Sequence, residues 1–278
     1  MGIQIGTVTI SWYGLFIVLG ITAGVLLGYI LMRINHLKFD DFIQVACFVG
    51  LGAMAGAKLL YLIVSWESID LSRITDPEYF SALMGGGFVF YGGVFGGLLG
   101  LYLCGKILHI QVAVYARAAI PVIPVTHAFG RIGCAFVGCC YGVPYDGPGA
   151  VVYTESIAAP LNVPLFPVQA VEAAGNLVIA AVLCLYGEIC RRNSKKPKSL
   201  QVYLILYAAF RFALEYVRYD DSERGILMGL STSQWISIVI CTGVIAVEIF
   251  RQKKSAVKIL FCWRDAGSSG NICQDKKS

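Results

Sequence analysis

Seven apolar runs, each close to the length of a bilayer span, recur along the chain and restrict its possible folds more than any other feature. A transmembrane helix needs about 20 predominantly apolar residues. The runs cover residues 12–32, 42–64, 88–108, 118–137, 168–186, 200–217 and 233–250. Charged residues make up only 14% of the chain, whereas soluble proteins carry about 25%, so a surface suited to water is largely missing. The sequence therefore predicts an all-α integral membrane protein with about seven transmembrane helices.

The fourth run, 118–137, differs from an ordinary membrane helix because it contains Pro121, Pro124 and Arg131. Proline interrupts the hydrogen bonding of a helix, and a charged side chain is costly to place in lipid. We therefore expect either a kinked helix or a partly re-entrant segment at this place.

Lysine and arginine residues collect in alternate gaps between the apolar runs, and this bias predicts the orientation of the chain. One set of gaps, together with the tail after residue 250, holds 16 basic residues, and the other set holds four. The four are Arg73, Arg131, Arg218 and Arg224. The amino terminus is thus expected outside and the carboxyl terminus in the cytoplasm. Residues 1–250 would form one transmembrane domain, and residues 251–278 a polar cytoplasmic tail. The net charge of +5 follows from this topology and requires no nucleic-acid partner.

Three of the apolar runs carry polar side chains spaced by three or four residues, so each set is expected to share one face of a helix. The sets are His127 with Arg131; Gln169, Glu172 and Asn176; and Arg211, Glu215 and Arg218. Such residues in a membrane helix usually face a protein interior or a cavity. Structural ion pairs, for example Arg211 with Glu215 or Glu172 with Lys58, would explain individual pairs.

The set as a whole contains more basic than acidic groups near the predicted outer ends of the helices. Arg131 and Arg218 together would form an anion clamp, because the planar guanidinium fork suits a phosphate group. An anion that reaches this site from the outer leaflet is most simply a phospholipid head group.

Glycine is unusually frequent in residues 85–100. Beyond Phe95 the pattern favours close packing of helices through small residues. Before that point, Gly85–Gly87 are expected to form a flexible turn that brings Tyr91 to the polar cavity. Tyr13 is interpreted either as an aromatic residue at the membrane interface or as a hydrogen-bond donor in the pocket.

Three of the ten cysteines, Cys134, Cys139 and Cys140, lie together at the outer end of the fourth run. Adjacent cysteines give poor tetrahedral ligand geometry, so we expect neither a metal site nor a cofactor. A vicinal disulfide or a persulfide-type carrier stays an alternative on the oxidising side of the membrane.

The segment Gly130-Arg-Ile-Gly-Cys-Ala-Phe-Val-Gly-Cys-Cys-Tyr-Gly142 resembles the signature of the prolipoprotein diacylglyceryl transferase family. Other segments resemble that family in the same order along the chain, and together they cover nearly all of residues 8–250. They are Ser11-Trp-Tyr-Gly-Leu, Ala55-Gly-Ala-Lys-Leu-Leu-Tyr61, Gly86-Gly-Phe-Val-Phe-Tyr-Gly-Gly93, Phe166-Pro-Val-Gln-Ala-Val-Glu172 and Arg211-Phe-Ala-Leu-Glu-Tyr-Val-Arg218. No single motif is specific, but the ordered set is.

The resemblance implies a transferase that moves a diacylglyceryl group from phosphatidylglycerol to the lipobox cysteine in the signal peptide of secreted precursor proteins. Such an enzyme would be a multi-pass protein of the bacterial cytoplasmic (inner) membrane. Arg131 and Arg218 would hold the phosphate and stabilise its charge. The remaining substrate-binding residues implied are Tyr13, Gln169, Glu172, Glu215, Gly92, Gly93, Gly130 and Gly142.

The chain departs from the family pattern at five positions that bear on catalysis. Cys134 and Val137 stand where the family usually has asparagine, and Cys139 stands where it has an acid; Tyr91 and Phe166 replace histidines. His127 is an additional histidine one helical turn from Arg131, so it becomes the candidate general base, with Tyr91 as a candidate donor. Two alternatives to the transferase stay open: a paralogue with another acceptor, and a non-catalytic lipid-binding protein.

Overall fold

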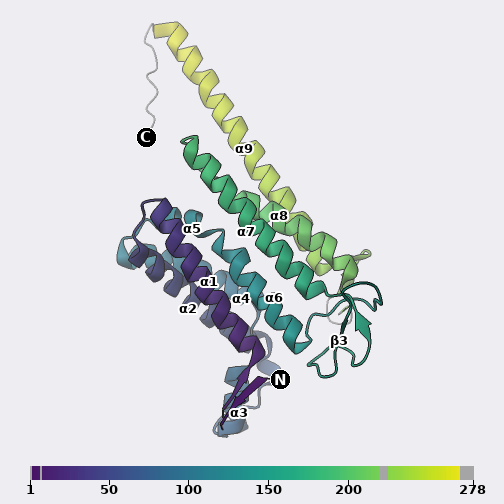
Figure 1. The fold of residues 1–278 in the computed structure, drawn as a ribbon. Coiled ribbons are helices and arrows are strands. Elements are labelled where there is room, and N and C mark those ends of the chain that lie inside the picture. The colour runs from purple at the N-terminus through teal and green to yellow at the C-terminus, as the bar shows by residue number, and fades with distance from the viewer. Residues whose placement is uncertain (1, 7, 220–224, 270–278) are drawn as a thin grey trace. The chain divides into compact units, whose positions relative to one another are not determined.

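The fold is known from a computed structural model that describes residues 2–6, 8–219 and 225–269 (Figure 1). The chain divides into two units. The first contains Met1–Ile17, His127–Leu185 and Leu200–Ser278, and the second contains Val18–Thr126 and Tyr186–Ser199. Each unit is considered by itself below.

Nine α-helices form most of the described chain (Figure 1). They are α1 (Trp12–Ile34), α2 (Phe39–Val64), α3 (Pro77–Gly85), α4 (Phe90–Leu108), α5 (Val112–Ala119), α6 (Val122–Val137), α7 (Val168–Arg192), α8 (Ser199–Leu214) and α9 (Thr232–Ser269). Short 3-10 helices cover Trp66–Ser68, Leu71–Arg73 and Glu215–Val217.

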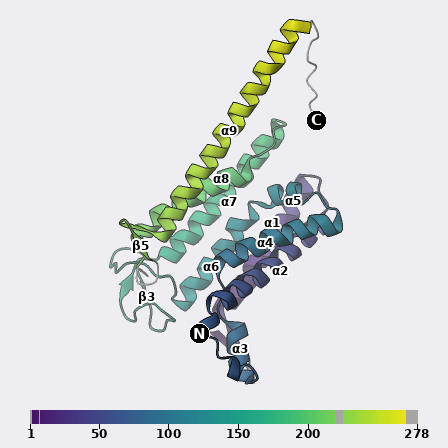
Figure 2. The same cartoon turned by 180° about the vertical axis from the view of Figure 1, so that it is seen from behind.

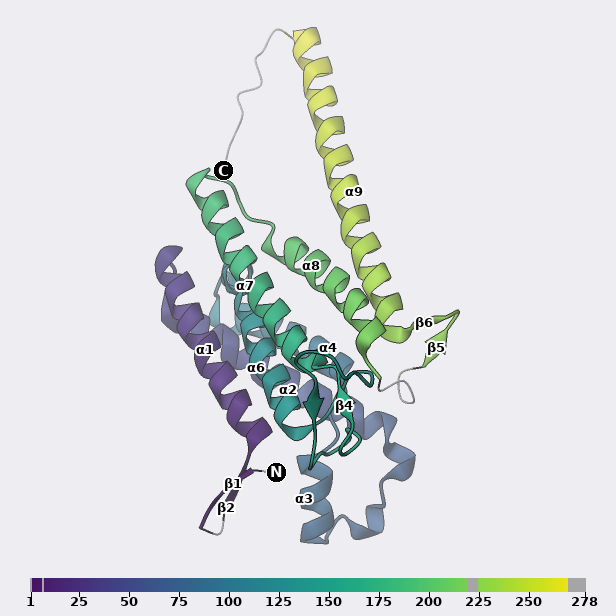
Figure 3. The ribbon, with the colours of Figure 1, turned by 45° about the vertical axis from the view of Figure 1, so that its right-hand side comes forward.

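Strands occur only as short antiparallel pairs within the described residues. They are β1 (Gly2–Ile5) with β2 (Val8–Ser11), β3 (Val151–Val152) with β4 (Pro164–Leu165), and β5 (Ile226–Leu227) with β6 (Leu230–Ser231). Figure 3 shows the β1–β2 hairpin leading into α1 and the β5–β6 hairpin between α8 and α9.

Among the described residues, six helices are long and apolar enough to cross a membrane, and there are seven spans if a bent pair of helices counts as one. The pair is α5 with α6, whose axes differ by 50° across the break at residues 120–121. Pro121 lies at the break because it has no amide hydrogen to continue the helical bonding. The all-α multi-pass membrane fold is therefore confirmed, and the fourth run is bent, as both a kinked helix and a re-entrant segment would be. The apolar part of α9 ends at Arg251, but the helix continues to Ser269, into the segment assigned to the tail.

In the second unit, α2 and α4 pack backbone against backbone (Figure 2). A Cβ atom added at Gly52 would collide with the carbonyl oxygen of Gly96, and one added at Gly92 would collide with that of Gly56. Gly100 makes the same close approach to the carbonyl of Phe48. Close packing through glycine thus extends across α4 and begins before Phe95, where the sequence had placed its start.

Lys58 on α2 holds the segment that leads from α3 into α4. Its ammonium group donates to the carbonyl oxygens of Leu83 and Gly86, the latter at 2.6 Å, and lies 4.8 Å from the centre of the Tyr61 ring. Gly87 has a φ of +67°, a conformation that glycine adopts without strain. The chain therefore turns at Gly86 and Gly87, whereas Gly85, which was predicted to belong to the turn, ends α3. Lys58 is bound by backbone carbonyls in place of the pairing with Glu172 that the sequence suggested.

Candidate active site

Glu172 on α7 is the centre of a buried group of charges in the first unit. Its side chain is only 2% exposed. One carboxylate oxygen, Oε2, lies 2.6 Å from Nη2 of Arg131 on α6 and 4.0 Å from Nη1 of Arg218. The other, Oε1, lies 3.7 Å from Nε2 of His127, one turn before Arg131. The polar residues of three separate segments thus converge on one carboxylate.

Two guanidinium groups, those of Arg131 and Arg218, face the single carboxylate of Glu172. The close contact of Arg131 with Glu172 does not have the geometry of a hydrogen bond. Arg131 Nε and Nη2, Glu172 Oε2 and Asn176 Oδ1 are all buried without a hydrogen-bond partner among the described residues. Buried polar atoms are normally satisfied, and Nη2 already lies in the ion pair with Glu172, so Nε is the donor of Arg131 that would bind an anionic ligand.

Arg218 reaches this group by a route that its sequence spacing did not predict. The expectation that Arg211, Glu215 and Arg218 share one helix face is wrong at its last member. The α-helix ends at Leu214, Glu215–Val217 form a 3-10 turn, and Arg218 has extended backbone with φ −92° and ψ 149°. Its backbone pairs with that of Gly142 in an antiparallel bridge.

Gly142 is needed for that bridge. A Cβ atom there would collide with the carbonyl oxygen of Phe166 and lie 3.0 Å from that of Val217. The amide of Val143 donates to Val217 O at 3.0 Å, and the amide of Phe166 donates to Val143 O at 2.9 Å. The chain after α6 is thus held between two other segments, and this arrangement fixes the backbone of Arg218.

Arg211 and Glu215 form a separate ion pair at 2.6 Å, and Arg211 also donates to Ser233 Oγ at 3.1 Å. For these two residues the structural ion pair that the sequence offered is present. A direct role of Glu215 in binding substrate stays a prediction.

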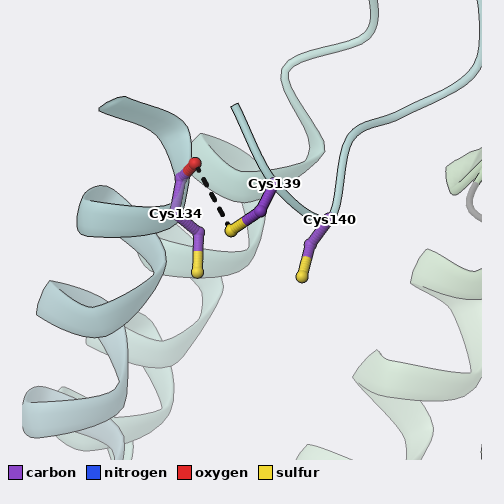
Figure 4. A group of neighbouring side chains, drawn as sticks. All are labelled: Cys134, Cys139 and Cys140. Atoms are coloured by element: carbon purple, nitrogen blue, oxygen red, sulfur yellow. Dashed lines mark hydrogen bonds between the residues drawn. The ribbon is translucent and has the colours of Figure 1, made fainter. Parts of the chain in front are cut away.

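The three cysteines gather at the end of α6 (Figure 4). The amides of Gly138 and Cys139 both donate to the carbonyl of Cys134, at 3.0 and 3.2 Å, which ends the helix. Gly138 and Cys140 have positive φ angles of 70° and 53°, and these turn the chain back on itself. The three sulfur atoms consequently lie within 4.8 Å of one another. Arg131 Nη1 lies 4.0 Å from Cys134 Sγ, so the cysteines adjoin the charged group.

Gln169 supports the cysteine turn. Its amide nitrogen donates to Cys139 O at 2.8 Å and to the hydroxyl of Tyr153 at 3.4 Å. The hydroxyl of Tyr153 in turn donates to Ala135 O at 2.9 Å. Burial raises the pKa of Tyr153, so its hydroxyl keeps its proton and acts as a donor. Sequence reasoning missed Tyr153, which lies in a long irregular segment where no periodicity marks it.

A cavity of about 460 Å³ opens beside the end of α6. Its walls include Trp12, Phe136, Tyr153 and Glu155. Tyr153 therefore separates this cavity from Gln169 and the cysteine turn.

Comparison with known proteins shows to which family these residues belong. The family model for prolipoprotein diacylglyceryl transferase matches residues 1–250. The chain belongs to this family. It is 33% identical to phosphatidylglycerol–prolipoprotein diacylglyceryl transferase 2 of Clostridium perfringens (strain 13 / Type A) over 231 residues, which is 83% of this chain and 87% of the relative.

Two further relatives carry the name phosphatidylglycerol–prolipoprotein diacylglyceryl transferase. The protein of Clostridium tetani (strain Massachusetts / E88) is 35% identical over 87% of this chain and 94% of its own length. That of Dehalococcoides mccartyi (strain 195) is 30% identical over 90% of this chain and 93% of its own length. Membership of the family thus rests on alignments that span most of both proteins.

The other residues that the family resemblance implicated lie in different surroundings. Tyr13 lies near the glycine face of α6, with its Cδ2 3.1 Å from where a Cβ of Gly133 would be. Gly130 has open space beside it, since the nearest atom, Ile17 Cδ1, is 3.9 Å from a Cβ built there. Tyr91, Gly92 and Gly93 belong to the second unit, and their part in the site of this family member stays a prediction.

Proposed function

We propose that this chain transfers the diacylglyceryl group of phosphatidylglycerol to the thiol of a lipobox cysteine in the signal peptide of a secreted precursor. One observation carries the proposal: a member of this transferase family buries Arg131 and Arg218 around the carboxylate of Glu172, and Arg131 Nε has no hydrogen-bond partner among the described residues. Buried guanidinium groups of this kind can bind the negatively charged phosphodiester of the lipid.

In the reaction the acceptor thiolate attacks the glyceryl carbon that bears the phosphodiester oxygen. A carbon–sulfur bond forms, the carbon–oxygen bond breaks, and glycerol phosphate leaves with the electron pair. Negative charge on the departing phosphate would be stabilised by Arg131, with Arg218 beside it. Glu172 would hold both arginines in place, because its Oε2 atom faces each of them.

The acceptor thiol must lose a proton before it attacks, since the thiolate is the nucleophile. Among the described residues near Glu172, His127 is the candidate base, because its Nε2 lies 3.7 Å from the carboxylate. Its side chain is 31% exposed, whereas that of Glu172 is 2% exposed. A proton could therefore leave through His127 more readily than through the carboxylate.

The enzyme is a multi-pass membrane protein, and we place it in the bacterial cytoplasmic membrane with its amino terminus outside. The distribution of basic residues supports this orientation. The reaction supports it too, because the lipobox of a translocating precursor is presented at the outer half of that membrane.

The test uses the purified chain in detergent that contains phosphatidylglycerol, with a synthetic lipobox peptide as acceptor. Mass spectrometry should show the peptide gaining one diacylglyceryl group. Arg131→Ala should lose product formation by about 100-fold or more, as expected for removal of a charge-stabilising donor. Arg73→Ala is the matched control, because Arg73 is 59% exposed and contacts the nearby Asp76 and Tyr79, outside the charged group.

A second candidate function, transfer to a different acceptor, is favoured by the replacement of two family histidines by Tyr91 and Phe166. In that case the protein would bind phosphatidylglycerol in an Arg131-dependent manner but leave the lipobox peptide unmodified. Binding that does not depend on Arg131, without product, would contradict both proposals.

A further inference from the structure

The cysteine cluster, defined as Cys134, Cys139 and Cys140, has no task in holding the lipid phosphate. Its geometry is nevertheless specific. Cys140 adopts a left-handed backbone conformation with φ 53°, which costs a non-glycine residue about 1–2 kcal/mol. Such strain persists where the surrounding structure enforces it and is concentrated at functional sites. The turn that stores this strain also points two sulfur atoms back toward a third.

The spacing of the three sulfur atoms fits a single metal ion. A zinc ion binds sulfur at about 2.3 Å, so sulfur ligands of one ion lie about 4 Å apart. In this chain the sulfur atoms are all within 4.8 Å of one another, which requires only small side-chain movements. Cys134 approaches from the last turn of α6, while Cys139 and Cys140 approach from the reversed chain, so the three ligands come from two directions (Figure 4).

The type of ligand distinguishes between metals. Thiolate ligands favour thiophilic ions such as zinc over magnesium or calcium. Three thiolates would carry negative charge, and a cation lies beside them, since Arg131 Nη1 is 4.0 Å from Cys134 Sγ. The ligand set therefore indicates an ion of the zinc class.

We propose that Cys134, Cys139 and Cys140 bind one divalent thiophilic metal ion of the zinc class, and that its fourth position takes the acceptor thiol. Three protein ligands with one open position are typical of catalytic zinc sites, whereas structural sites have four. The metal site stands on the geometry of this chain. The role of the open position rests on the transferase function proposed above.

An open position on the metal would provide a means of deprotonating the acceptor thiol. A thiol that coordinates zinc is deprotonated, and its proton passes to water or to His127. The bound thiolate then donates its electron pair to the glyceryl carbon, and glycerol phosphate leaves with the electrons of the broken carbon–oxygen bond. The alkylated sulfur is a thioether, a weaker ligand, so the product dissociates and the site is regenerated.

Gln169 and Tyr153 would support the metal site by holding the backbone next to its ligands. Gln169 fixes the carbonyl of Cys139, and Tyr153 fixes that of Ala135 next to Cys134. Both contacts hold the backbone that carries the ligands, as outer-layer contacts do in known metal sites. This accounts for a glutamine whose side chain faces the cysteine turn.

The first experiment measures metal binding by the full-length reduced protein in detergent. Titration with Co²⁺ should give the absorption of a tetrahedral cobalt–thiolate centre at one ion per chain, and Zn²⁺ should displace it. Single serine substitutions at Cys134, Cys139 or Cys140 should weaken Zn²⁺ binding by more than about tenfold, since even outer-layer changes cost about 10–100-fold. The controls are Cys104→Ser and Cys184→Ser, which remove thiols outside the cluster.

Correct folding of each variant is checked by its melting temperature and by phosphatidylglycerol binding, so that a loss of metal is not confused with a loss of structure. Absence of a cobalt–thiolate spectrum from the folded parent overturns the metal site. A titration of the parent that finds a disulfide within the cluster under the same reducing conditions overturns it as well.

The second experiment separates the metal proposal from the proposed function. Metal-free protein should fail to modify the lipobox peptide, and one equivalent of Zn²⁺ should restore product. Full transfer by metal-free protein would remove the metal from the mechanism and leave the transferase function intact. Tight binding of Zn²⁺ without product under any condition would keep the metal site and reject the transferase function, together with the role of the open position.

Discussion

The α2–α4 pair and the α6–α7 pair hold apolar helices together by opposite means. Between α2 and α4, the backbones at Gly52, Gly56 and Gly96 come into direct contact. Between α6 and α7, charged side chains are buried, and Glu172 faces Arg131 at 2.6 Å. In lipid, both small residues and polar contacts promote helix association. Many small backbone contacts stabilise the first helix pair, whereas a few buried charged groups, each costly to desolvate, hold the second pair together.

This comparison leads to an expectation about function. A glycine contact contributes packing alone and gives the protein no chemistry. A buried ion pair is weak support for stability, because the desolvation of the two charges offsets much of their attraction. We therefore expect the charges of the first unit to be present for binding and catalysis, and the glycines of the second unit for stability.

The largest expected effect follows from removing the carboxylate at the centre of the charged group. Glu172→Leu would leave Arg131 and Arg218 without the anion between them, and breaking a buried pair in this way costs about 3–5 kcal/mol. Thermal unfolding of the detergent-solubilised protein should show a markedly lower melting temperature.

The matching variant replaces the entire group. Arg131→Met and Arg218→Met combined with Glu172→Leu should restore much of the lost stability, since apolar groups of similar volume often replace a buried ion pair without loss. Transfer activity should stay absent. A triple variant as unstable as the single one would contradict the view that these charges serve function more than stability.

A smaller loss is expected at the glycine interface. Gly52→Ala inserts a methyl group against the carbonyl of Gly96 and should cost about 1–3 kcal/mol, as overpacking does in a tight contact. Gly50→Ala on the same helix is the control, because a Cβ there meets nothing within 4 Å. Equal melting temperatures for the two variants would show that the backbone contact contributes little.

The smallest effect is expected at the cysteine turn, beside the charged group. Tyr153→Phe removes one hydroxyl that donates to Ala135 O and accepts from Gln169, a loss of about 0.5–1.5 kcal/mol. Differential scanning calorimetry should detect a small decrease in melting temperature. If metal affinity falls more than stability does, Tyr153 positions the turn; if both are unchanged, the hydroxyl has no role there.

Residue spacing along a helix predicted which side chains face Glu172 only where the helix is continuous. His127 and Arg131 are four residues apart on a continuous helix, and both face Glu172 as their spacing predicts. Arg218 was expected on the same basis, but α8 ends four residues earlier, at Leu214. It reaches Glu172 because Gly142 allows two backbone segments to approach, which no local pattern records.

The amino-acid sequence by itself determined the membrane class, the positions of most spans and the irregularity of the fourth run. These follow from the length of apolar runs, the absence of charge and the missing proline amide, which are local properties. The ordered motifs also indicated the family.

The tertiary structure alone decided which polar groups meet. Glu172 became the centre because its burial leaves it no solvent, so neighbouring cations must compensate its charge. The three cysteines converge because two residues with positive φ angles reverse the chain after α6. Those angles depend on hydrogen bonds and packing with segments more than 15 residues away in sequence, such as Gln169, and only folding brings these segments together.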